Sequence, residues 1–104
     1  MPSHEWIDER SLALHEAVAA RLEERPELVA VARENLRRWM AGNPSAALRE
    51  WQQVLDKRSI SELLTLLRSR SERAARLRQS SPFAGVLDAA QRRAIFDEYE
   101  SRRP

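Results

Sequence analysis

The chain has 104 residues, and its 18 basic and 16 acidic side chains leave a net charge of +2. This length fits one domain with a modest core. The lack of cysteine excludes disulfides, thiolate metal sites and cysteine nucleophiles, and no apolar run reaches the roughly 20 residues that cross a bilayer. Since the N-terminus also lacks the features of a signal peptide, we expect a single cytoplasmic domain over residues 1–104, without membrane association.

Apolar residues recur at helical spacing along the first half of the chain. Ser3 predicts the N-cap of a first helix, which Pro26 should end. Pro26 also suits the first turn of a second helix, closed by Gly42. Asn43 followed by Pro44 predicts the N-cap and first turn of a third helix.

Two serine–glutamate pairs at the spacing of a capping box predict further helix starts. Ser59 with Glu62 begins a fourth helix, whose isoleucine- and leucine-rich segment we place at the centre of the core. Ser69 with Glu72 repeats the pattern and predicts a kink or a restart, although one continuous helix also fits the apolar period.

Asp88 and Gln91 form a third such pair and predict a last helix, followed by a frayed end at residues 101–104. No segment shows the alternation of a strand. The predicted fold class is therefore all-α, an irregular bundle of five or six helices in a single domain. The largest apolar side chains should anchor its core: Trp6, Trp39 and Trp51.

Few side chains fit catalysis or metal binding. His4 and His15 would lie on one helix about 16 Å apart, given a rise of about 1.5 Å per residue, which is too far to share a metal ion. We interpret both as partly exposed polar positions. Ser80 or Ser81 as a nucleophile would need a base from a distant part of the chain, so a turn role is favoured. We expect no enzyme, cofactor or metal site; a hydrolase or transferase would need a pocket lined by His15 or by paired carboxylates.

Positive charge is concentrated ahead of a Ser-Pro-Phe turn, because residues 58–80 hold six arginines and two glutamates. Arg70, Arg73 and Arg76 fall at steps of three, which would place them on one flank of a helix, and Arg78 extends this row into the turn. A solvated helix face is the plain interpretation, whereas the weak neutralisation favours an anionic partner. The predicted contact residues are Arg70, Arg73, Arg76, Arg78, Gln79, Ser80, Ser81 and Phe83.

Residues 36–55 have the outline of a DNA-binding helix-turn-helix, with a Gly-Asn-Pro turn between two helices. The second of these helices bears only Arg49 and a terminal Lys57, too few donors for a typical recognition helix. Phe83 is the one aromatic residue near the arginines, and we expect it to pack into the core, which disfavours single-strand binding. A nucleic-acid-binding regulator that uses the Arg70–Arg78 face remains the alternative function.

Three segments of the chain resemble a family of small uncharacterised bacterial proteins of about this length. They are Leu-Arg-Gln-Ser-Ser-Pro-Phe-Ala-Gly-Val-Leu at 77–87, Trp-Ile-Asp-Glu-Arg-Ser-Leu-Ala-Leu-His at 6–15 and Leu-Arg-Glu-Trp at 48–51. Members resemble the helical antitoxin-like partners encoded beside toxins, nucleotidyltransferase-like toxins among them. Where members often carry Thr-Pro or Ser-Pro before the last helix, this chain has Asp88–Ala89, which keeps the capping role.

The resemblance implies a non-enzymatic protein that binds and restrains a bacterial toxin or another product of a neighbouring gene. Three tryptophans in so short a chain also leave a homodimer open, since they favour uncovered apolar surface.

Overall fold

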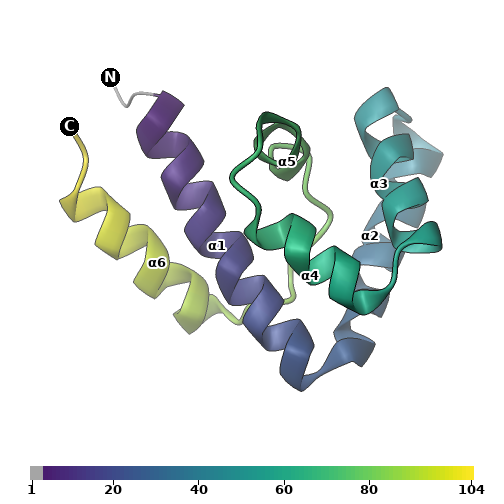
Figure 1. The fold of residues 1–104 in the computed structure, drawn as a ribbon, viewed down its shortest axis with the longest axis horizontal. Coiled ribbons are helices and arrows are strands. Elements are labelled where there is room, and N and C mark those ends of the chain that lie inside the picture. Colours follow the sequence, from purple (N-terminus) through teal and green to yellow (C-terminus); the bar gives the residue numbers. More distant parts are fainter. Residues whose placement is uncertain (1–3) are drawn as a thin grey trace.

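The computed structural model describes residues 4–104, which form helices joined by short loops (Figure 1). In chain order these are α1 (His4–Glu24), the 3-10 helix η1 (Pro26–Leu28), α2 (Val29–Gly42), α3 (Ala46–Lys57), α4 (Ile60–Arg68), α5 (Glu72–Arg78) and α6 (Ala89–Ser101). The described residues contain no strand. The predicted all-α, irregular bundle is confirmed.

The longest helix, α1, crosses the middle of the molecule and contacts α4, α5 and α6, whereas α2 and α3 pack against each other (Figure 1). The buried side of α1 contains Leu12, Val18, Ala19 and Leu22. Within residues 4–104, none of the helices combines the length and apolar character that a membrane span requires.

The leucines of α4 lie in the core, as predicted. Leu63, Leu64, Leu66 and Leu67 are all buried, and burial of each such side chain contributes about 1.5–3 kcal/mol. Ile60, which we grouped with them, keeps 39% of its surface exposed. It is the first residue of the helix.

The three tryptophans differ in burial, so the prediction that all of them anchor the core is wrong. Trp51 of α3 is fully buried, whereas Trp39, one turn before the end of α2 at Gly42, is 36% exposed. Trp6 is half-buried at the seam between α1 and α6. Helical spacing predicts that a residue lies on an apolar face, but it does not predict whether another helix covers that point.

Two of the predicted capping boxes are present in full. Ser59 and Glu62 exchange side-chain-to-backbone hydrogen bonds at the start of α4, and Asp88 and Gln91 do so at the start of α6. Such caps satisfy backbone N–H groups that the first turn of a helix leaves unpaired. The predicted N-cap Ser3 lies outside the described residues.

The predicted restart between the fourth and fifth helices is confirmed, but its predicted cap is wrong. Ser69 is the C-cap of α4, and the hydroxyl oxygen of Ser71 accepts a hydrogen bond from the backbone N–H of Ala74 at 3.1 Å. Ser71 therefore starts α5. Its own N–H donates to the Ser69 hydroxyl oxygen at 3.1 Å, so the two serines share the corner.

The start of α3 also differs from the prediction. Asn43 still closes α2, because its backbone N–H donates to the carbonyl oxygen of Trp39 at 2.8 Å. Ser45 caps α3 instead, accepting from the N–H of Leu48 at 3.2 Å. Ser45 takes the N-cap position because the backbone N–H of Asn43 is still bonded to the preceding helix.

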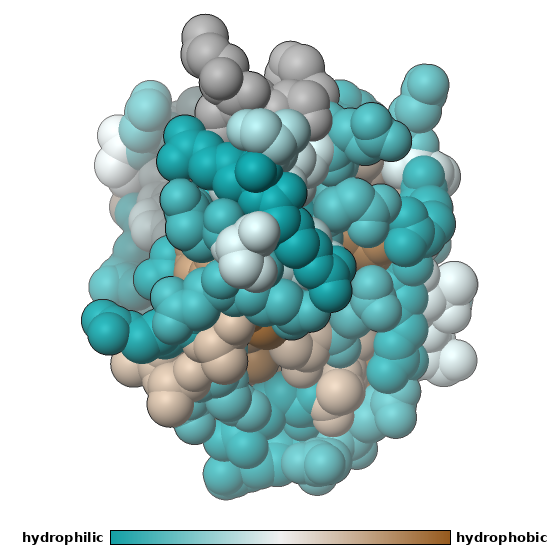
Figure 2. Space-filling model, turned by 90° about the vertical axis from the view of Figure 1, so that its left-hand side faces the viewer, coloured by the Kyte–Doolittle hydropathy of each residue, from teal (hydrophilic) through white to brown (hydrophobic). Residues whose placement is uncertain are grey.

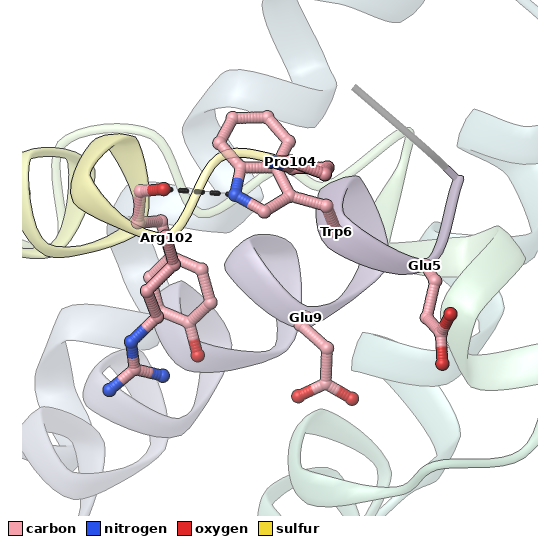
Figure 3. A pocket seen from close by; sticks show the side chains of 6 residues that line it. Glu5, Trp6, Glu9, Arg102 and Pro104 are labelled. Atoms are coloured by element: carbon pink, nitrogen blue, oxygen red, sulfur yellow. Dashed lines mark hydrogen bonds between the residues drawn. The ribbon is translucent and has the colours of Figure 1, made fainter. Parts of the chain in front are cut away.

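Only partly buried and exposed residues make up α6, and it packs along α1. The indole N–H of Trp6 donates to the carbonyl oxygen of Tyr99 at 2.9 Å (Figure 3). The guanidinium of Arg10 lies 4.9 Å from the Trp6 ring and 4.7 Å from the Phe96 ring, so it bridges the two helices. Seen from the α6 side, the surface is mostly hydrophilic (Figure 2).

The C-terminal end leaves α6 after Ser101. Arg102 and Arg103 turn back to pair with Glu98 and Glu100 at 2.7 and 3.2 Å. These pairs are exposed, and such pairs are worth about 0–1 kcal/mol.

Candidate functional site

The predicted row of arginines does not lie on one helix flank. Arg70 precedes α5, and its Nη1 pairs with Oε1 of Glu9 on α1 at 2.6 Å. Arg73 and Arg76 belong to α5 and share Glu50 of α3, at 3.1 and 3.7 Å. The break between α4 and α5 turns Arg70 toward α1, while the other two arginines face α3.

These three arginines remain accessible in spite of their pairing. The side chains of Arg70, Arg73 and Arg76 are 69%, 45% and 67% exposed. The hydrogen bond to Glu9 raises the pKa of Arg70 above its ordinary value. Because exposed ion pairs contribute about 0–1 kcal/mol, carboxylates from another molecule can replace the internal ones at little cost.

Arg78, the fourth arginine of the predicted set, is buried at the end of α5. Its Nη1 donates to the carbonyl oxygen of Ser69 at 2.6 Å, and its Nε finds no acceptor within residues 4–104. Burial lowers the pKa of this guanidinium. Arg78 thus braces the corner between α4 and α5 and presents no charge at the surface in this conformation.

The Ser-Pro-Phe turn is fastened to the core through aromatic side chains. Phe83 is buried, as expected, and packs edge-on against Trp51 with ring centroids 5.5 Å apart. The indole N–H of Trp51 donates to the carbonyl oxygen of Leu77 at 2.7 Å.

Gly85, in the same turn, has a backbone φ of +93°, a conformation that residues with a Cβ rarely adopt.

Asn35 of α2 holds the same turn from the other side, and the sequence analysis missed it. Its Nδ2 donates to the carbonyl oxygens of Pro82 and Ala84, both at 2.8 Å, and its Oδ1 accepts from Arg38 at 2.6 Å. Asn35 stands four residues after Val31 on the apolar stripe of its helix. An amide in that position is the signal that could have identified it, since a buried polar side chain needs partners.

His15 also reaches the turn, and its predicted partial exposure is wrong, because it is buried. Its Nε2 lies 2.7 Å from the Ser81 hydroxyl and its Nδ1 lies 2.7 Å from the carbonyl oxygen of Ser11. Since a carbonyl only accepts, Nδ1 carries the proton and Nε2 accepts from the Ser81 O–H. The N–H of Phe83 donates weakly to Ser81 Oγ at 3.3 Å. The other predicted histidine, His4, has its side chain outside the described part of the structure.

The distance between Ser81 and His15 is that of a nucleophile and its base, the arrangement a hydrolase would need. Burial lowers the pKa of His15 to about 4, with a smaller contribution from the positive charge of Arg78. A general base works best with a pKa near the working pH, and the group that orients this imidazole is a carbonyl rather than a carboxylate. The pair is therefore better suited to supporting the turn than to removing a proton.

The predicted contact residues thus fall into three groups. Arg70, Arg73, Arg76 and Gln79 are exposed, Ser80 and Ser81 are half-buried, and Arg78 and Phe83 are buried. In the part of the chain that the structure describes, acidic and histidine side chains form no group that could hold a metal ion. No protein-family model, curated protein or solved structure matches the chain.

Proposed function

We propose that this protein binds and restrains an acidic protein partner, as an antitoxin-like component does with the product of a neighbouring gene. The proposal rests on the resemblance of residues 6–15, 48–51 and 77–87 to such partners, and on the charges around α5. It assigns binding rather than catalysis, and it places Arg70, Arg73 and Arg76 in the contact surface, with Gln79 beside them.

One observation carries the proposal: two exposed arginines share a single carboxylate. Glu50 is the only acidic side chain within 4.0 Å of Arg73 or Arg76 among residues 4–104, so one positive charge stays unmatched beside α3. Partner carboxylates that approach this side gain charge-assisted hydrogen bonds and displace only a weak internal pair.

The test is the affinity for the neighbouring gene's product, measured by calorimetry with the purified full chain. Glu50→Gln should strengthen binding several-fold, because both guanidinium groups become available. Arg73→Glu combined with Arg76→Glu should weaken binding at least tenfold through like-charge repulsion. Arg37→Glu is the control for a charge reversal elsewhere on the surface, since Arg37 is an exposed arginine that pairs with Glu34 within α2. Equal affinities for all these variants would refute the assignment.

A nucleic-acid-binding role for the Arg70–Arg78 face is the alternative. The burial of Arg78 and the separation of Arg70 from Arg73 leave fewer aligned cations for phosphates than the sequence predicts. Binding to duplex DNA at low salt that weakens steeply with added salt, together with no affinity for the neighbouring product, would favour this alternative over a protein partner.

A further inference from the structure

A cavity of about 300 Å³ lies beside the His15–Ser81 pair, at a place where α1, the turn and α6 meet. Its walls are mainly apolar, formed by Leu14 and Val18 of α1 together with Phe83 and Leu87. This volume is at the low end of small-molecule sites, and about twice that of a cavity that holds benzene. It suits a ligand of roughly ten non-hydrogen atoms.

The polar groups already described in this cavity are satisfied by one another. His15 accepts from Ser81 and donates to a backbone carbonyl, and Ser81 also accepts from the N–H of Phe83. Burial keeps the imidazole neutral at neutral pH, because it lowers the pKa to about 4. The His15–Ser81 pair therefore adds polar atoms to the cavity wall but no charge.

Arg92 of α6 is the one cation among the described residues that line the cavity, and it forms no ion pair within residues 4–104. Its guanidinium lies 5.0 Å from the Phe96 ring, and no acidic side chain of residues 4–104 lies within 4.0 Å of it. Ala84 and Gly85 also line the cavity, and their backbone N–H groups donate no hydrogen bond within the described chain. The described lining contains no aspartate or glutamate, although the whole chain has 16 acidic residues.

We propose that this cavity binds a small amphipathic carboxylate, with its apolar tail between α1 and Leu87 and its carboxylate on Arg92 and the turn N–H groups. The charge complementarity selects an anion, and the apolar walls select a hydrocarbon chain over a purely polar ion. This site is separate from the arginines of the proposed protein interface and does not depend on it.

The test is a titration of the isotope-labelled full chain with sodium octanoate at pH 7, followed by amide chemical shifts. We expect saturable shifts at Ala84, Gly85 and along Leu14–Val18, with a dissociation constant on the order of 1–10 mM, as the size of the ligand implies. Octylammonium chloride, which has the same tail and the opposite charge, should produce no saturable shift at these amides.

Three variants make the result specific. Arg92→Gln should weaken octanoate binding about tenfold, whereas Arg93→Gln, the neighbouring arginine outside the cavity, should leave it within about twofold. Ala84→Leu should block the cavity from its exposed edge while keeping the backbone bond to Asn35. Octanoate shifts that do not saturate, that match those of octylammonium, or that persist in Arg92→Gln would overturn the proposal.

Discussion

His15 and Asn35 are polar side chains buried against one turn, and each reaches it from far away in the sequence. His15 is 66 positions from Ser81, and Asn35 is 47 positions from Pro82. The turn itself was predictable, because serine, proline and glycine have local backbone preferences. Its two anchors were not predicted. The place of Asn35 on an apolar stripe indicates that its amide is buried, but no local pattern indicates which distant backbone that amide, or the imidazole of His15, will contact.

The buried, neutral His15 makes stability depend on pH. Its pKa is about 4 in the folded protein and 6.5 in the unfolded chain, so the unfolded state binds more protons as the pH falls below 6.5. The contribution of neutral His15 to the free energy of unfolding is therefore fully present above pH 6.5 and is lost as the pH falls toward 4. Between pH 7 and pH 5 we expect urea denaturation to show a loss of about 2 kcal/mol from this group.

The control for this effect is His15→Gln, which cannot titrate and should flatten the pH dependence over the same interval. A ring-proton titration of the wild-type chain gives the pKa directly. An imidazole that titrates at or above 6.5 in the folded protein would contradict the argument.

At the scale of the helices, start signals are predictable where one residue can act and ambiguous where two compete. The boxes at Ser59 and Asp88 formed as predicted because the preceding helices have their C-caps before these residues, at Arg58 and Gln79. At the start of α5 the N-cap is Ser71 rather than Ser69, because Ser69 is already the C-cap of α4. The end of one helix thus decides the start of the next, and sequence patterns leave boundaries uncertain by a few residues.

The attachment of α6 differs from that of the other helices, because it rests on an arginine between two rings rather than on buried leucines. Arg10→Gln removes both cation–π contacts, to Trp6 and Phe96, each worth about 0.5–1 kcal/mol at an exposed site. Amide hydrogen exchange in α6 should then become several-fold faster, while exchange in α4 stays unchanged. Arg93→Gln, which changes an arginine of α6 itself, is the control that should change neither exchange rate. Uniform acceleration across the whole chain would show instead that α6 and the core unfold together.

At the scale of the whole molecule, apolar periodicity predicted the buried faces but not how the helices pair. Trp51 and Trp39 both stand on the apolar stripe of their helix, yet Trp51 is fully buried against Phe83 whereas Trp39 keeps 36% of its surface exposed. The predicted contact set was limited in the same way. Whether an arginine is exposed, as Arg73 is, or buried, as Arg78 is, depends on how α5 sits in the bundle, which no local pattern fixes.

The same division between core and surface predicts how stability responds to salt. Every arginine that forms an ion pair within residues 4–104 keeps at least 41% of its side chain exposed, so these pairs are screened and individually weak. Raising sodium chloride from about 0.05 to about 0.5 M should change the free energy of unfolding by less than about 1 kcal/mol. Leu67→Ala, in the fully buried part of α4, should cost about 2–5 kcal/mol in the same urea experiment.

A salt-induced loss as large as that of Leu67→Ala would mean that the surface ion pairs, those of Glu9 and Glu50 among them, hold the bundle together. Partner carboxylates could not then replace Glu9 or Glu50 without unfolding the protein. A small loss leaves both glutamates exchangeable, because the core of α1 and α4 maintains the fold while the surface pairs open. Insensitivity of stability to salt, combined with salt-sensitive binding of the neighbouring product, is therefore the result that the proposed interface requires.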